Sequence, residues 1–588
     1  MKANKTTTEH YLYGLAFLLA LGMRLYQLGA ASLTDVEAGW ALQALGLVHG
    51  ESVTLGAQPA YILLTSQLFS ILRDTNFLAR LFPALAGSLI IWLPWCLQRW
   101  MGDSSWLRRA GIVMAFGLAI DPGLVSLSRQ AGSLMPAMVF TLLILVCLYN
   151  RRMIWAGIFA GLALLSGLAF LQGLPILGLS WGLYLLISRK LVNNQPMEAG
   201  AEPPTGSLPV QSIRVGVIAF SLTLLFAGTL FLRAPQGLGA LAETIPAYLK
   251  SWIASSGIPV LRLPASLLIY QPLVLIFAII GAVRAWFKDW DDQHPRQALI
   301  LLSIWAVVGI LLPLLYAGRQ VGDMAWALVP LWALAAIEIS RSLLADEDRL
   351  THLVAAGLGL LLFILAVVGW MNILSIGRYQ VNVVIYWAVI IGAFLLGLIA
   401  SLLVVAGWSA RAAKLGVVWA LCIVLALQLI SNTWGTVILR QNGVRELWAH
   451  PPTTGQADLL SVTLADLSSR NTGLRDQLEI VVLADSPALK WALRNYPNTR
   501  FETALSSTES PPVVITLKGA EELSLAEKYR GQDFVWRLYP GWQGVFPPDF
   551  INWLAFRQAP LGQDQIILWA RADIFPGGGS DTTGSATP

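Results

Sequence analysis

Residues 383–406 read VVIYWAVIIGAFLLGLIASLLVVA, without one charged side chain. A helix needs roughly 20 consecutive apolar residues to cross the hydrocarbon core of a bilayer. This stretch is long enough and apolar enough to do so. It therefore predicts a membrane-spanning helix.

The same length criterion selects about thirteen segments along the chain. They are residues 11–28, 80–98, 110–128, 133–149, 153–170, 172–188, 213–232, 266–283, 298–316, 325–342, 352–370, 383–406 and 415–433. The apolar stretch 61–72 is short, which favours an interfacial or re-entrant helix. Composition agrees, because 56% of the residues are hydrophobic and 12% are charged, against about 25% charged in soluble proteins. The sequence predicts a mainly α-helical polytopic membrane protein.

Basic residues indicate how the chain is oriented in the membrane. If the N-terminus is cytoplasmic and 61–72 does not cross, three basic pairs lie in cytoplasmic loops, as the positive-inside rule requires: Arg108/Arg109, Arg151/Arg152 and Arg189/Lys190. A crossing at 61–72 would move all three outside. We therefore expect a protein of the cytoplasmic membrane with residues 1–433 as its transmembrane domain and 189–212 as a cytoplasmic linker. An odd number of spans places the C-terminal part outside.

From about residue 431 the composition becomes that of a soluble protein. Strands are expected at 478–483, 513–517, 534–538 and 565–570, and helices at 486–496 and 520–529. Alternating strands and helices predict a small extracytoplasmic α/β domain over residues 434–575. The Gly/Ser/Thr-rich residues 576–588 are expected to be a disordered tail.

A second set of charges falls at the expected outer ends of the spans. It comprises Arg24, Asp35, Glu37, Arg73, Asp74, Arg80, Asp121, Arg129, Arg233, Glu243, Lys250, Arg262, Arg319, Asp323 and Arg378. Any one of them can reach the interface or pair with a neighbouring acid, as Arg319 with Asp323. Arginines oppose the positive-inside bias on this side, however, so the set as a whole favours a shared role.

An outward-facing cavity lined by guanidinium groups fits a phosphate or diphosphate. The sequence has no Walker or dinucleotide loop, so a soluble nucleotide donor is not indicated. A phosphate met at the outer face of a membrane belongs most simply to a lipid. The basic residues lie at segment ends and not in a run, which argues against nucleic acid as a partner.

The first outer loop, residues 33–45, reads LTDVEAGWALQAL and carries two carboxylates. Attack of a hydroxyl on a sugar carbon benefits from a carboxylate that takes the proton. The alternative is that Thr34 or Asp35 caps a surface helix. Asp35 and Glu37 are two residues apart, so they would not share one helical face.

An ordered series of short motifs gives the sequence a family resemblance. Arg24 lies near the end of the first span, and the acidic pair is followed by Ala38 and an Ala/Leu-rich helix. Further motifs are Gln58–Tyr61 (QPAY), 77–87 (FLARLFPALAG), 126–129 (SLSR), 268–273 (LIYQPL) and Gly318–Arg319 through 328–331 (LVPL). Together they resemble the polyprenyl-phosphate-sugar-dependent glycosyltransferases of the GT-C superfamily, which include protein O-mannosyltransferases and the lipid A aminoarabinose transferase. The resemblance covers residues 11–433.

The resemblance implies a GT-C-like helical bundle that transfers a sugar from a polyprenyl phosphate to an acceptor hydroxyl of a glycan, lipid or protein. It implies Asp35 as the base, with Glu37 supporting it or holding a divalent metal ion, the one cofactor that this family would suggest. Arg24, Arg80, Arg129 and Arg319 would bind the lipid phosphate. The family's acidic residues are adjacent, whereas Val36 separates them here.

Two other interpretations remain open at the level of sequence. A GT-C protein without catalysis would bind a lipid-linked glycan or assist a flippase, and the absence of an acid among residues 132–134 favours it. A transporter would require matching broken spans in the two halves, which the sequence does not indicate.

Overall fold

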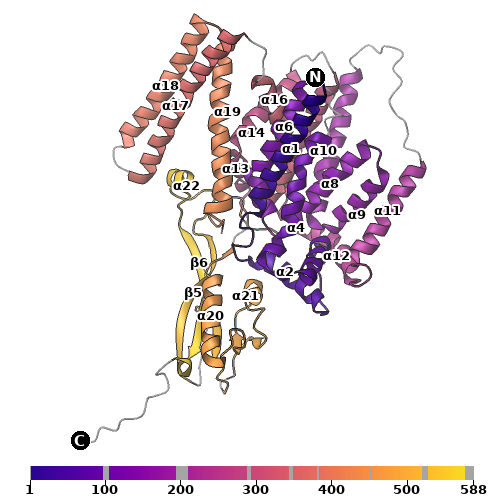
Figure 1. Ribbon diagram of the computed structural model, residues 1–588, viewed down its shortest axis with the longest axis vertical. Coiled ribbons are helices and arrows are strands. Elements are labelled where there is room, and N and C mark those ends of the chain that lie inside the picture. Colours follow the sequence, from indigo (N-terminus) through magenta and orange to yellow (C-terminus); the bar gives the residue numbers. More distant parts are fainter. Residues whose placement is uncertain are drawn as a thin grey trace.

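The computed structural model describes residues 2–96, 105–193, 210–287, 293–343, 348–379, 383–441, 443–449, 452–506, 508–519 and 527–575. It has a large helical part and a smaller C-terminal part built on a sheet beyond one end of the helices (Figure 1). Most of the linker expected at 189–212, and the tail at 576–588, lie outside the described residues.

The helical part follows the chain in order. Its helices are α1 (Lys2–Leu25), α2 (Asp35–Val48), α3 (Pro59–Ile71), α4 (Asn76–Leu89), η1 (Ile90–Trp92), α6 (Ser105–Ile120), α7 (Pro122–Ser128), α8 (Leu134–Tyr149), α9 (Met153–Leu165), α10 (Leu168–Asn193), α11 (Val210–Gly228), α12 (Gln236–Ser251), α13 (Arg262–Tyr270), α14 (Pro272–Phe287), α15 (Gln293–Leu315), η2 (Val321–Met324), α16 (Ala325–Leu343), α17 (Arg349–Tyr379), α18 (Val383–Gly407), α19 (Ala410–Trp434) and η3 (Gly435–Leu439).

The described residues contain eight helices long and apolar enough to cross a membrane, or up to ten if each of two bent pairs is one span. The chain is therefore a multi-pass membrane protein. Each of the thirteen expected segments contains helix, but the count of about thirteen spans is not confirmed. A physical reason is length: α8 has 16 residues and α9 has 13, fewer than the roughly 20 that a span needs. The stretch expected at 61–72 is α3, a helix of 13 residues.

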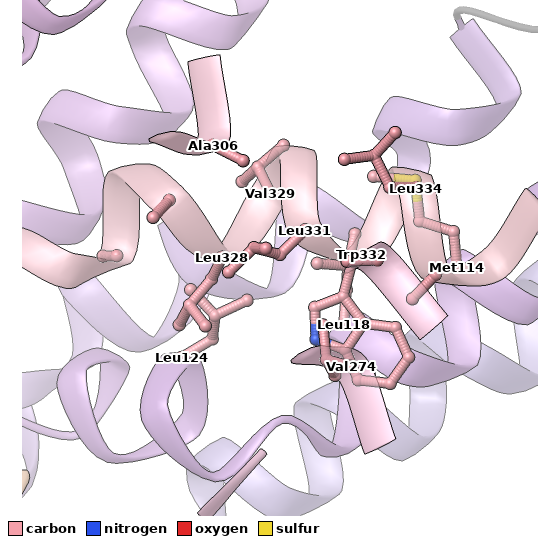
Figure 2. Packing of buried hydrophobic residues seen from close by; sticks show 14 of the residues in the cluster. Met114, Leu118, Leu124, Val274, Ala306, Leu328, Val329, Leu331, Trp332 and Leu334 are labelled. Carbon is pink, nitrogen blue, oxygen red and sulfur yellow. The ribbon is translucent and has the colours of Figure 1, made fainter. Parts of the chain in front are cut away.

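The core of the helical part surrounds α16. Figure 2 shows Trp332 of α16 beside Leu118 of α6 and Val274 of α14. Trp332 approaches so closely because position 117 is a glycine, where an added Cβ would lie 2.1 Å from the indole ring. The Trp332 Nε1–H donates a hydrogen bond of 2.8 Å to Asp121 Oδ2. This hydrogen bond connects the core to Asp121, which lies at a bend between two helices.

Asp121 lies at the 52° bend between α6 and α7, and Gln271 lies at the 96° bend between α13 and α14. Asp121 Oδ1 accepts hydrogen bonds from Leu124 N at 2.8 Å and from Gln271 Nε2 at 3.1 Å. The buried carboxylate thus caps α7 and joins the two broken helices. Because a helix break exposes backbone groups that need partners, this cross-link fixes where α7 begins, at Pro122.

The C-terminal part has a six-stranded mixed sheet in the order β1-β5-β6-β4-β2-β3. Its elements are β1 (Thr453–Thr454), α20 (Ala457–Thr472), β2 (Ile480–Val482), α21 (Pro487–Ala492), β3 (Thr499–Phe501), β4 (Val513–Leu517), β5 (Tyr529–Pro540), α22 (Phe550–Phe556), β6 (Leu561–Arg571) and η4 (Ala572–Ile574). Strand β2 is parallel to β3 and β4, and the other pairs are antiparallel. The expected α/β class is confirmed, including β4 at the expected residues. Most of the helix expected at 520–529 lies outside the described residues, and β5 begins at Tyr529.

The sheet domain is bound to the helical part where α3 leads into α4. Arg494 Nε lies 2.5 Å from Asp74 Oδ2, and the Trp491 Nε1–H donates a hydrogen bond of 2.8 Å to Asn76 Oδ1. Trp491 lies in α21 and Arg494 follows two residues after its end; α21 packs against α2. The sheet domain therefore packs against the helical part at α2 and at the start of α4.

Candidate functional site

A cavity of about 520 Å³ lies where the helical part meets the C-terminal part. It is lined by the first outer loop, the residues that follow α7, the turn over 316–323 and the segment over 436–454. Of the six residues proposed from the sequence, Glu37, Arg80 and Arg129 line it. Asp35, Arg24 and Arg319 are not among its lining residues.

Glu37 and Arg80 form a buried ion pair on the cavity lining. Arg80 Nε and Nη2 donate to the two carboxylate oxygens at 2.9 and 2.7 Å. The carboxylate also accepts the backbone N–H groups of Thr34 at 3.0 Å and Ala131 at 2.8 Å. Burial raises the pKa of Glu37, but the charge of Arg80 and these hydrogen bonds outweigh it, so that the pKa lies below the ordinary value.

The remaining nitrogens of Arg80 are used as well. Nη1 donates to the carbonyl oxygens of Leu28 and Ala31 at 3.3 and 2.7 Å, and Nη2 donates to Ser32 O at 3.1 Å. A guanidinium has five N–H donors, and this one directs all of them at protein groups. Arg80 therefore holds residues 28–37 against α4 and has no free donor for a ligand.

Arg129 ends α7 and holds the end of α1. Its Nη1 donates to Tyr26 O at 2.7 Å and to Arg24 O at 3.1 Å, and Nη2 donates to Gln27 O at 3.4 Å. Burial and the nearby charge of Arg80 lower the pKa of Arg129 to about 10, so the side chain is still positively charged at neutral pH. Its Nε makes no hydrogen bond to the described residues.

Asp35 faces the sheet domain and not the cavity. Its Oδ1 accepts hydrogen bonds from Ser486 Oγ at 2.5 Å and Ala488 N at 3.1 Å, and Oδ2 lies 2.7 Å from Arg537 Nε. The alternative interpretation, in which this stretch begins a helix, is confirmed. Thr34 caps α2, and Glu37 completes a capping box with it. Because Asp35 and Glu37 are two residues apart on α2, they point to different faces of the helix. The position of Asp35 therefore does not fit the role of base expected from the resemblance.

Arg24 and Arg319 also lie outside the cavity lining. Arg24 is fully buried, and it donates to Ser128 Oγ and to the carbonyl oxygens of Leu118 and Ala119, each at 3.2 Å. It thereby satisfies the end of α6 and cannot reach a ligand. Arg319 Nη1 donates to Ile258 O at 3.3 Å. The expected phosphate-binding role does not fit the position of either side chain.

Arg440 is a cavity residue that the sequence did not single out. Its Nε pairs with Glu446, while its two terminal nitrogens have no partner in the part of the chain that the structure describes. The next residue, Gln441, hydrogen-bonds Gln27, whose carbonyl accepts Arg129. Arg129 and Arg440 thus border the same region of the cavity. Arg440 follows the last span, where charged residues are ordinary, so composition gave no signal.

Asp323 is a second cavity residue that was not among the proposed site residues. It is 8% exposed and lines the cavity. Sequence proximity suggested an ion pair with Arg319, but within the described residues Asp323 has no ion pair. Its Oδ2 accepts a hydrogen bond of 2.8 Å from Gln320 N.

The cavity residues do not fit a divalent metal ion. The described residues contain no group of three or more His, Cys, Asp or Glu side chains that could hold one. Glu37, the proposed ligand, already accepts four hydrogen bonds.

No protein-family model and no curated protein sequence matches this chain. Among solved structures, ArnT from Cupriavidus metallidurans bound to undecaprenyl phosphate is similar over 98% of this chain and 100% of its own, with 15% identity and a TM-score of 0.52. The chain has the GT-C fold. The apo form of the same ArnT has a TM-score of 0.49 at 14% identity, covering 98% of this chain and 99% of its own. The oligosaccharyltransferase of Archaeoglobus fulgidus covers 84% of this chain and 64% of its own, with a TM-score of 0.41 at 13% identity. The GT-C resemblance inferred from residues 11–433 is thus confirmed at the level of fold.

Proposed function

We propose that this GT-C protein is a membrane glycosyltransferase. It moves a sugar from a polyprenyl-phosphate donor to an acceptor hydroxyl of a glycan, lipid or protein at the outer face of the cytoplasmic membrane. The observation that carries the proposal is the pair Arg129 and Arg440, which border one region of a 520 Å³ cavity in a GT-C fold. The similar ArnT structure contains undecaprenyl phosphate, which supports a lipid phosphate as the donor's carrier.

The chemistry follows from the free donors in the cavity. Transfer breaks the bond between the sugar's anomeric carbon and a phosphate oxygen, and negative charge builds up on that phosphate. Guanidinium groups oriented toward it stabilise the charge and the leaving group. Arg440 has two terminal nitrogens available and Arg129 has Nε. Arg80, whose donors are all used, keeps Glu37 and the first outer loop in place.

The C-terminal part contributes to the same cavity. The segment that leads into it supplies Thr436, Arg440 and Trp448, and β1 supplies Thr453 and Thr454. The sheet domain is also bound to the first outer loop through Asp35. We propose that this domain recognises the acceptor, because its strand β1 lines the cavity and the domain lies beyond one end of the helices (Figure 1).

Transfer of labelled sugar in proteoliposomes tests the proposal. Purified protein is supplied with undecaprenyl-phosphate-linked pentoses and hexoses, and with membrane lipids, glycans and peptides as acceptors. The wild type is expected to transfer label, and Arg440→Gln is expected to lose most of the rate. Arg500→Gln, which removes an exposed arginine of the sheet domain, is the matched control. Full transfer by an Arg129→Gln, Arg440→Gln double variant would contradict the proposed donor site.

A second candidate is a GT-C protein that binds a lipid-linked glycan without catalysis, as a scaffold or flippase partner. Two observations favour it: Asp35 is bound to the sheet domain, and both oxygens of Glu37 are occupied. Tight, Arg440-dependent binding of undecaprenyl phosphate without turnover of any donor would support this candidate over the enzyme.

A further inference from the structure

The cavity carboxylates differ in how many partners they have. Of the residues that the structure describes, three acidic side chains line the cavity: Glu37, Asp323 and Glu446. Glu37 is held by Arg80 and two backbone N–H groups. Glu446 is 2% exposed and pairs with Arg440, with Arg557 at 3.4 Å and with the hydroxyl of Tyr270. Neither has an oxygen free to take a proton from a substrate.

Asp323 is different because one of its oxygens is free. It lies in η2, the short turn that leads into α16, and its Oδ2 accepts the N–H of Gln320. That bond is ordinary capping and needs only one oxygen. Within the described part of the chain, Oδ1 has no hydrogen-bond partner and the carboxylate has no ion pair. Asp323 lines the cavity, so its carboxylate can accept a further hydrogen bond from a ligand bound there.

Two other residues of the cavity lining, Gln172 and Gln320, have unsatisfied polar groups. Gln172 is 3% exposed; its Oε1 accepts the hydroxyl of Tyr248 at 3.3 Å, while its Nε2 is buried without a partner in the described residues. Gln320 Oε1 is likewise buried and unpartnered. A buried polar group without a partner costs about 1–3 kcal/mol. Donors and acceptors of this kind in the same cavity as a carboxylate fit a ligand rich in hydroxyl groups.

We propose that Asp323 Oδ1 is the proton acceptor for the attacking hydroxyl, and that Gln172 and Gln320 hold the hydroxyl-bearing acceptor there. This inference rests on the proposed function and replaces Asp35 in the role of base. The acceptor oxygen uses a lone pair to bond to the anomeric carbon, and its proton moves to Asp323 Oδ1. The bond from that carbon to the phosphate oxygen breaks, and its electron pair stays on the polyprenyl phosphate beside Arg440. Asp323 then releases the proton to water, so that the step balances without a co-reactant.

The variant Asp323→Asn separates a proton acceptor from a structural cap. Its side-chain oxygen can still accept the Gln320 N–H, so the turn is retained, but the amide cannot take a proton. General-base catalysis contributes about 10²–10⁴-fold, so single-turnover transfer from undecaprenyl-phosphate-linked sugars should fall at least ~100-fold. Binding of undecaprenyl phosphate should not change. Asp485→Asn, which changes an exposed carboxylate of the sheet domain, is the matched control and should transfer at the wild-type rate.

Chemical rescue adds a readout that a structural role would not produce. Asp323→Ala should be inactive and should regain transfer when sodium formate supplies a small carboxylate, whereas Asp323→Asn should not respond. Wild-type transfer by Asp323→Asn would overturn the inference and leave the proposed function standing. Loss of both lipid binding and transfer in Asp323→Asn, without formate rescue of Asp323→Ala, would assign Asp323 a structural role and also overturn it. A wild type that turns over no donor would overturn the proposed function and this inference together.

Discussion

Glu37 and Arg80 are joined by two hydrogen bonds, of 2.9 and 2.7 Å, between residues 43 positions apart in the sequence. Both side chains are 7% exposed. The pair closes the first outer loop against α4 and forms part of the cavity lining. A motif that the sequence suggested for catalysis therefore has a structural role that can be measured separately from activity.

Glu37→Ala should destabilise the protein by about 3–5 kcal/mol, because it leaves the Arg80 charge buried without a partner. The double variant Glu37→Leu, Arg80→Met should be less destabilised than Glu37→Ala, since it removes both charges. Denaturant titration of the purified proteins in detergent measures the free energy of unfolding of both variants. A double variant that loses more stability than the single one would contradict this account.

The same pair predicts a pH dependence of stability. The pKa of Glu37 is lowered in the folded protein, so its contribution is complete above about pH 4.3, the ordinary glutamate pKa. The contribution is lost as pH falls through the lower folded-state value. The stability difference between wild type and Glu37→Gln should therefore be largest at neutral pH and shrink below pH ~4. A difference that grows on acidification would show that Glu37 is not ionised in the folded protein.

Asp35→Ala should loosen the sheet domain. It removes hydrogen bonds to a charged acceptor, each worth about 1.5–3 kcal/mol, from Ser486, Ala488 and Arg537. Amide hydrogen exchange over 486–494 should accelerate. Asp485→Ala, whose exposed carboxylate contacts Lys490, should leave the exchange of this helix close to that of the wild type. Equal protection in Asp35→Ala and wild type would refute the docking role.

Gly117→Ala should be destabilising by about 1–3 kcal/mol, the usual cost of overpacking a core. The added Cβ would lie 2.1 Å from the Trp332 ring, which the hydrogen bond to Asp121 holds in place. Gly178→Ala is the matched control, because a Cβ at that helical position meets no atom within 4 Å. Thermal unfolding in detergent compares the two variants. Equal midpoints would mean that α6 shifts freely relative to α16.

The helices were predictable from sequence because apolar length is a local property, and every expected segment contains helix. The number of spans was not, since α8 and α9 end short of a full span. The Asp121–Gln271 link between broken helices depends on residues 150 positions apart, which a linear pattern does not reveal.

The site was predictable in part for a similar reason. Arg80, Arg129 and Glu37 stood out because charges at outer ends of spans are unusual, and they line the cavity. Arg24 is also a charged residue at the end of a span, yet its side chain donates to backbone carbonyls of α6 and not to the cavity. The sequence did not distinguish the environments of Asp35 and Glu37. In the structure, Asp35 contacts the sheet domain and Glu37 contacts Arg80. Arg440 gave no signal because a charged residue after the last span is ordinary.

The central claim is that a polyprenyl phosphate binds in the cavity with its phosphate beside Arg440 and Arg129. A structure determined by electron cryo-microscopy with added undecaprenyl phosphate tests this directly. The account predicts phosphate density within hydrogen-bond distance of the Arg440 terminal nitrogens, with Arg24 remaining buried away from it. Phosphate density bound at Arg319 or elsewhere outside the cavity would contradict the account.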